Sequence, residues 1–262
     1  MTAIAAPANP RPRIAWGRYL GFVSPVLFVL LWWAVAAAEW FPPEILVSPG
    51  AVLAAFAELW QSGELPDHLA ATFARLGGGF GAGVLAGLVY GCIAALSRTV
   101  LDYTAPTFTA IRTVPSIAFI PILILIFGIG ETFKILVVAK ACFFPVALAT
   151  LEAVRGIPQR FTDVARAYRL PAFYRLRRVI LPATLPSVIT GVRLGLGRSW
   201  GVLVAAELVA SQNGLGQMME FGRQMFRLDV VMVGVIVTGL VGFGMDRALR
   251  GVEARLSRWK VA

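Results

Sequence analysis

The chain has 262 residues, of which 58% are hydrophobic, and its formal net charge is +10. Soluble domains contain about 45–50% apolar residues, so this composition indicates an integral membrane protein. The positive charge does not indicate nucleic-acid binding, because the cations lie between apolar runs and no basic soluble domain holds them. Cys92 and Cys142 both lie within apolar runs, which favours a packing role over a disulfide.

Six apolar segments are each long enough to form a membrane-spanning helix, which needs about 20 residues. They are residues 20–38, 72–96, 103–128, 132–151, 184–210 and 230–246. The first resembles a secretory signal, but its apolar run is longer than a signal core, so we interpret it as an uncleaved helix. Pro106, Pro115 and Pro121 interrupt the third segment.

The distribution of Lys and Arg predicts that both chain ends are cytoplasmic. Three cations precede the first span, Arg98 follows the second, seven lie in residues 152–182 and five follow the last span. Residues 39–67 hold five acidic residues and no Lys or Arg, which places them outside. The predicted organisation is a cytoplasmic tail (1–19), a single transmembrane domain (20–250) with a cytoplasmic loop (152–182), and a second cytoplasmic tail (251–262).

Two outer segments have different patterns. Residues 48–60 predict a short surface helix, with Ser48 as its cap and Pro49 in its first turn. Residues 211–228 are mixed in character and predict an irregular outer or re-entrant segment.

Glycines recur at intervals of four within two of the spans. They are Gly79, Gly83, Gly87 and Gly91 in the second span, and the pairs Gly191–Gly195 and Gly197–Gly201 in the fifth. Small residues at this spacing share one helix face and allow another helix backbone to approach closely.

Charged residues within the spans are candidates for a solute pathway, because an ionisable group in a membrane faces protein, water or a partner charge. The candidates are Arg112, Arg193, Arg198 and Glu207. For Arg112, the alternative is a structural arginine satisfied near Asp102. Lys134 is expected to extend to the surface, whereas Lys140 lies deeper in its span.

The sequence offers no metal-binding or catalytic motif. His68 is the one histidine, and neither a His/Cys cluster nor a Walker A pattern occurs. Glu131 and Glu207 lie on different spans without matching carboxylates, which disfavours a membrane protease. We therefore predict no catalytic residues, no metal site and no cofactor bound by this chain.

The loop at residues 152–182 contains two short amphipathic helical patterns. Phe161, Val164, Ala165 and Tyr168 recur at helical spacing, and Pro171 ends this first pattern. A second apolar face leads to Pro182. The positive charge of the loop alone would fit cytoplasmic orientation and binding of anionic lipid. The periodic apolar side chains favour a protein partner in addition.

This loop resembles the permease loop of binding-protein-dependent importers of the ATP-binding-cassette (ABC) superfamily, written E-A-A-x3-G-x9-I-x-L-P. The matching positions are Asp163, Val164 and Ala165 for E-A-A, Arg169 for the glycine, and Val179, Leu181 and Pro182 for I-x-L-P. Arg169 is a departure, because the family glycine allows a turn between two helices. Pro171 offers a break two residues later.

Further stretches resemble the nitrate, sulfonate and taurine class of these permeases. They are residues 112–131, 143–150, 181–207 and 213–216. The resemblance implies the type I importer permease fold, in the bacterial cytoplasmic (inner) membrane. It also implies a pathway for a small anion such as an aliphatic sulfonate, taurine or nitrate, with bicarbonate or a pyrimidine or vitamin precursor as alternatives.

The resemblance further implies a set of partners. These are a second permease copy, as a homodimer or a heterodimer, a cytoplasmic ATPase dimer that binds ATP and Mg, and a periplasmic or lipid-anchored substrate-binding protein. The chain itself would not be an enzyme. The implied ATPase-coupling residues are Phe161, Asp163, Val164, Ala165, Arg166, Tyr168, Arg169, Leu181 and Pro182.

The alternative of another class is a stand-alone secondary transporter or channel. Such folds show two halves with repeated hydropathy, and no clear repeat is visible here. A stand-alone protein would also give no reason for a paired-helix cytoplasmic loop.

Overall fold

The computed structural model describes residues 16–42, 45–158, 168, 171, 174 and 176–256. Within these residues all regular elements are helices, which confirms the predicted all-α class. The longer helices are α1 (Trp16–Ala37), α3 (Glu64–Leu96), α4 (Arg98–Thr113), α6 (Glu131–Arg155), α9 (Leu181–Val209) and α11 (Leu228–Leu256). The shorter ones are α2 (Pro49–Gln61), η1 (Ser116–Phe119), α5 (Ile120–Phe127), the π-helical η2 (Leu176–Ile180) and α10 (Leu215–Gln224).

All six predicted spans overlap a helix or a broken helix. Of the described helices, α3, α6 and α11 are long and apolar enough to cross a membrane, and α4 with the η1–α5 segment can count as a fourth, bent span. In α1 the described apolar part is shorter, at Val23–Ala37. With 29 residues, α9 is about 43 Å long, at 1.5 Å per residue.

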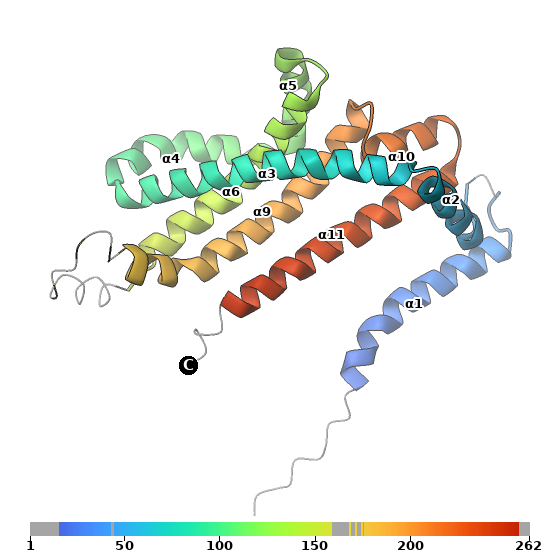
Figure 1. The fold of residues 1–262 in the computed structure, drawn as a ribbon, viewed down its shortest axis with the longest axis horizontal. Coiled ribbons are helices and arrows are strands. Elements are labelled where there is room, and N and C mark those ends of the chain that lie inside the picture. The colour runs from blue at the N-terminus through green and yellow to red at the C-terminus, as the bar shows by residue number, and fades with distance from the viewer. Residues whose placement is uncertain are drawn as a thin grey trace, which may run out of the picture.

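Helix α6 is the centre of the bundle, with α3 and α9 packed along it (Figure 1). The glycine face of α3 lies directly on α6, as predicted. A Cβ added at Gly83 would meet the Ala139 carbonyl of α6, and one at Gly91 would meet Thr150. These contacts show that α3 and α6 run parallel and that their backbones touch.

The fifth span confirms one of its two predicted glycine pairs. A Cβ at Gly191 would meet Ala149, and one at Gly195 would meet Cys142, so this pair brings α9 close to α6 in antiparallel orientation. The prediction was wrong for Gly197 and Gly201, which have open space around the Cβ position. They lie on another face of α9, because α-helical residues two apart point in different directions.

The third predicted span is broken into two helices at one of its three prolines. Pro106 lies inside α4, whereas α4 and the η1–α5 segment meet at an angle of 93° around Val114 and Pro115. A proline disfavours the α conformation of the residue before it. Val114 is accordingly extended (φ −74°, ψ 122°), and α5 projects away from the bundle (Figure 1).

For the two segments that were predicted to lie outside, one structural prediction is confirmed and one is wrong. Ser48 caps α2 by accepting a hydrogen bond from the Ala51 amide (3.3 Å), as predicted. Residues 211–228 are not irregular throughout, because α10 forms within them. Leu215, Met218 and Met219 of α10 are buried at helical spacing, a pattern that the mixed composition of this segment obscured.

Candidate functional site

A cavity of about 1300 Å³ lies between α4, α6, α9 and residues 156–158. The lining residues are Arg112, Phe144, Pro145, Leu148, Ala149, Glu152, Ala153, Gly156, Ile157, Pro158, Ala183, Ser187, Thr190, Gly191, Leu194 and Arg198. Gly191 allows the close packing of α6 and α9 along one wall of the cavity. At one end the lining includes the last turn of α6 and residues 156–158, which lead into the predicted coupling loop.

Two of the four predicted pathway residues, Arg112 and Arg198, line this cavity. Arg112 comes from the last turn of α4 and Arg198 from the middle of α9. Both side chains are exposed. Arg112 forms no ion pair with Asp102, which lies ten residues earlier on α4 and is 3.8 Å from Arg98. The cavity therefore has two cationic side chains from different helices.

Arg193 lies in a different arrangement, which links α9 to α11. Its Nε is 3.3 Å from the Glu253 carboxylate and its Nη1 is 3.8 Å from that of Asp246. Thr190 also donates a hydrogen bond to Glu253 (2.5 Å), and Arg250 pairs with Asp246 (2.7 Å). The charge of Arg193 is thus offset by two acidic side chains of α11.

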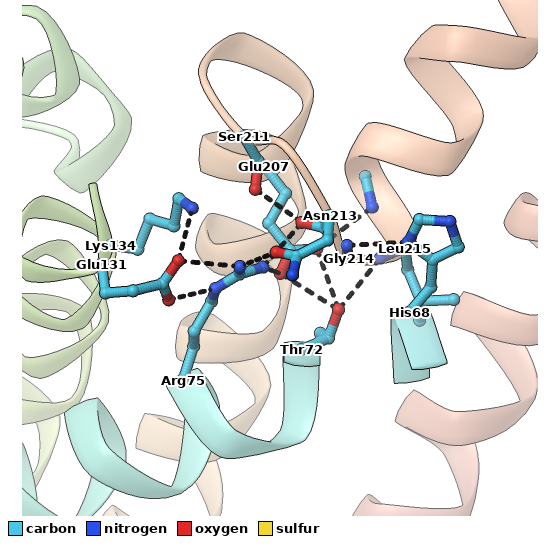
Figure 2. A network of polar contacts seen from close by, with 11 residues as sticks. His68, Thr72, Arg75, Glu131, Lys134, Glu207, Ser211, Asn213, Gly214 and Leu215 are labelled. Atoms are coloured by element: carbon cyan, nitrogen blue, oxygen red, sulfur yellow. Dashed lines mark hydrogen bonds and ion pairs between the residues drawn. The ribbon is translucent and has the colours of Figure 1, made fainter. Parts of the chain in front are cut away.

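Glu207, the fourth predicted residue, lies away from the cavity in a buried polar network (Figure 2). Its Oε1 accepts a hydrogen bond from Arg75 of α3 (2.7 Å), and its Oε2 accepts one from the Gly216 amide (3.1 Å). Thr72 donates to the same carboxylate at 3.0 Å. The side chain of Glu207 is fully buried, so the network satisfies an otherwise isolated carboxylate.

Arg75 is the central donor of this network and joins three segments of the chain (Figure 2). Its guanidinium binds Glu131 through Nε (2.5 Å) and Nη2 (2.9 Å), and it donates to both oxygens of Asn213. Lys134 adds a contact of 3.1 Å to Glu131. The two buried cations Arg75 and Lys134 therefore match the buried carboxylate Glu207 and the exposed carboxylate Glu131, so the charges of the network balance.

Lys134 corrects a prediction. It does not extend to the surface but is buried, with 2% of the residue exposed, beside Glu131. The sequence reasoning also missed Arg75. A signal was available, because Arg75 is the one Lys or Arg between residues 65 and 97, and an arginine in an apolar span requires an acidic or polar partner.

The loop between α9 and α10 completes the network from the backbone side. The amides of Gly214 and Leu215 donate to His68 Nδ1 and Thr72 Oγ1, each at 2.9 Å. His68, the one histidine, thus acts as a hydrogen-bond acceptor on α3. Among the described residues there is no group of His, Cys, Asp and Glu side chains that could hold a metal ion.

Most of the predicted coupling residues lie outside the described residues, namely Phe161, Asp163, Val164, Ala165, Arg166 and Arg169. Tyr168 is described and is 76% exposed. Leu181 and Pro182 form the first turn of α9, where a proline is tolerated because the first amides have no helical partner. Leu181 is exposed on this turn.

Comparison with known proteins gives a consistent set of similarities. The family described as "binding-protein-dependent transport system inner membrane component" matches residues 83–258. A relative in Bacillus subtilis, SsuC, is named as an aliphatic sulfonates transport permease and is 35% identical over 250 residues, covering 95% of this chain and 90% of the relative. The taurine transport system permease TauC of Escherichia coli is 36% identical over 89% of this chain and 86% of its own.

The fold is also similar to a solved structure. A chain of the MetNI methionine ABC transporter, in an inward-facing conformation, aligns with a TM-score of 0.53 and 24% identity. The alignment covers 69% of this chain and 92% of that chain. At this identity the similarity concerns the arrangement of the helices alone.

Proposed function

This chain belongs to the family of binding-protein-dependent transport system inner membrane components, and we propose that it forms the pathway of an ATP-driven importer of aliphatic sulfonates or taurine. Membership of this family makes it a multi-pass permease of the inner membrane. The substrate class follows from the names of the two relatives, which are aliphatic sulfonate and taurine permeases. Nitrate and bicarbonate, or a pyrimidine or vitamin precursor, are the alternative substrates.

The proposed assembly has four kinds of component. Two copies of this chain would enclose the pathway, and an ATPase dimer would bind ATP and Mg on the cytoplasmic side. A substrate-binding protein would deliver the solute to the outer side, and lipid would surround the permeases. The chain itself would hydrolyse nothing, because the ATPase is a separate subunit in this proposal.

One structural relationship carries the proposed coupling mechanism. The cavity wall includes Glu152, Gly156 and Pro158, which are the first part of the predicted coupling loop 152–182. On the other side of the loop, Ala183 and Ser187 of α9 line the same cavity. A force on the loop would therefore act on two walls of the cavity, which is the arrangement that an ATPase needs to open and close it.

A stand-alone secondary transporter or channel is the competing function. The family description names a binding-protein-dependent system, and this favours an importer with separate subunits. Genes for an ATPase and a secreted binding protein beside the gene of this chain would add support for the importer.

The docking part of the proposal is tested by co-purification. We expect the tagged chain, extracted in mild detergent, to co-purify with the ATPase at one ATPase copy per permease copy. The double substitution Asp163→Lys and Val164→Glu should abolish ATPase binding. It reverses the charge at position 163 and places a charge on the apolar face of the predicted helix. Membrane insertion should be unchanged, as measured by the amount of chain in the membrane fraction.

Asp102→Lys serves as the matched control, since Asp102 is exposed on α4 and lies outside the loop. This variant should keep the ATPase. If the double variant still co-purifies with the ATPase, the loop is not the docking site. Uptake of labelled taurine by proteoliposomes that contain the permease, the ATPase and the binding protein tests the substrate class separately.

A further inference from the structure

Two helix contacts show how deep each charged residue lies in the cavity. The Ser199 hydroxyl of α9 donates to the Val138 carbonyl of α6 (3.1 Å), and Lys140 of α6 donates to the Val114 carbonyl after α4 (3.2 Å). Arg198 precedes Ser199, and Arg112 lies two residues before Val114. Both arginines therefore lie near the level of residues 138–140 of α6.

The carboxylate in the cavity lies at the opposite end. Glu152 is 12 residues beyond Lys140 on α6, which corresponds to roughly 18 Å at 1.5 Å per residue. It lies at the end of the cavity where α6 leads into residues 156–158. Because of this separation, Glu152 does not neutralise Arg112 or Arg198. The end of the cavity lined by these two arginines, called the inner end below, is therefore cationic.

Within the described part of the chain, Arg112 and Arg198 also differ from the other Lys and Arg residues of the predicted spans in having no partner. No ion pair or side-chain hydrogen bond involves either residue within the described part of the chain. In contrast, Arg75, Lys134 and Arg193 each lie within 4 Å of a carboxylate. An arginine without a partner in a membrane segment is costly, which favours an external anionic ligand.

The apolar part of the inner lining is suited to a short hydrocarbon. Phe144 of α6 and Leu194 of α9 line the cavity, and Leu194 is one helical turn from Arg198. Guanidinium groups bind tetrahedral oxyanions through charge-assisted hydrogen bonds. The inner end thus combines two cationic donors with an aliphatic and an aromatic surface.

From these observations we infer that the inner end of the cavity is a subsite for the sulfonate group of an aliphatic sulfonate, bound by Arg112 and Arg198. This inference rests on the proposed function and adds a binding site within the permease itself. The sulfonate would lie between the two arginines, and its carbon chain would contact Phe144 and Leu194. Arg193 and Glu207 would not contact the solute, because their partners lie within the protein.

Cysteine labelling in the importer complex, reconstituted in lipid without ATP, tests the subsite. Leu194→Cys, in a chain with Cys92→Ala and Cys142→Ala, places one thiol beside Arg198. The probes are 2-sulfonatoethyl methanethiosulfonate, which is an aliphatic sulfonate, and its trimethylammonium analogue. The quantity compared is the rate of reaction with the anionic reagent divided by the rate with the cationic reagent. We expect this ratio to be about tenfold higher for the thiol at position 194 than for a free thiol in solution. Excess ethanesulfonate should slow its reaction.

The arginines should account for this preference. Arg112→Gln with Arg198→Gln should remove most of the tenfold preference. The matched control, Arg98→Gln with Arg223→Gln, removes two exposed cations elsewhere and should leave the preference unchanged. A second thiol, Ser187→Cys, lies eleven residues from Arg198 on α9, toward the end of the cavity that holds Glu152, and should show a weaker preference.

Three results would overturn the subsite. They are an unchanged preference in the Arg112→Gln and Arg198→Gln variant, an equal preference at Ser187→Cys, and a thiol at position 194 that reacts with neither reagent. Co-purification of the ATPase and taurine uptake report on the proposed function independently. An importer that assembles and transports while the labelling shows no charge preference would therefore retain its function and lose the subsite.

Discussion

The guanidinium of Arg75 lies 2.7 Å from the carboxylate of Glu207, although 132 residues separate them in the sequence. Both side chains are almost completely buried, with exposures of 4% and 0%. Through Glu131 the same arginine also reaches the first residue of α6. The pair therefore holds the N-terminal half of α3, the start of α6 and the end of α9 together, at the side of the bundle opposite residues 156–158.

The first prediction concerns the loss of this arginine. Arg75→Met should destabilise the folded chain by about 3–5 kcal/mol, because it leaves the buried Glu207 carboxylate without its cation. The measurement is the thermal unfolding of the purified chain in detergent. Arg98→Met is the control, since Arg98 is exposed and its ion pair spans 3.8 Å. Equal melting temperatures for the two variants would show that the network does not stabilise the bundle.

The second prediction separates crowding from backbone strain at Gly214. This residue has φ +111°, and an added Cβ would meet Glu207 and Arg75. Gly63 is also strained (φ +82°), but the space around its Cβ position is open. Gly63→Ala should therefore cost about 1–2 kcal/mol, and Gly214→Ala should cost clearly more. Similar unfolding temperatures for both variants would indicate that strain alone acts at Gly214.

The third prediction concerns the contact of α3 with α6. A Cβ at Gly83 would lie 2.5 Å from the Ala139 carbonyl, so Gly83→Ala should push the helices apart and lower the yield of folded chain. Gly81, on the same helix, has open space, and Gly81→Ala should raise stability by up to about 1 kcal/mol through helix propensity. The two substitutions should thus have opposite signs in thermal unfolding. An equal effect would exclude close packing as the reason for the glycines.

The fourth prediction is a pH dependence of the contact between α2 and the residue before α11. Arg227 donates two hydrogen bonds to Glu58 of α2, at 3.1 and 2.9 Å, and these lower the pKa of the Glu58 carboxyl below 4.5. A lowered pKa means that the stabilisation is complete above pH 4.5 and is lost as the pH falls through the lowered value. Glu58→Gln should remove this part of the acid dependence. The effect should be small because the pair is exposed, and parallel acid-unfolding curves for the two chains would contradict it.

The sequence predicted the helices and two glycine-mediated helix contacts better than it predicted the polar network. Apolar length located the spans, and glycine spacing identified the face of α3 that touches α6, because both are local patterns. The partners of Arg75 could not be predicted in this way, since Glu131, Glu207 and Asn213 come from segments that meet only in the folded chain. The same limit applies to Arg193 and Arg198, which are five residues apart on α9. Both line a small second pocket with Asp246, but Arg193 pairs with Glu253, and no described carboxylate forms an ion pair with Arg198.

The fifth prediction concerns Lys140, whose ammonium group lies at the break between α4 and α5. It donates to the Val114 carbonyl (3.2 Å), lies 3.5 Å from the Ser116 hydroxyl, and is 4.1 Å from the centre of the Phe119 ring. Val114 is the C-cap residue that directly follows α4, so its carbonyl has no helical donor. Lys140 therefore holds the 93° bend by satisfying this carbonyl.

Lys140→Met should loosen the bend, because it keeps the length of the side chain and removes the donor. Spin labels at Tyr103→Cys and Leu125→Cys, which replace exposed residues of α4 and α5, report the angle as a distance distribution. We expect this distribution to broaden in Lys140→Met and to stay narrow in Lys140→Arg, which retains a cationic donor. A narrow distribution in both variants would show that the geometry around Pro115 is sufficient to maintain the bend without the lysine.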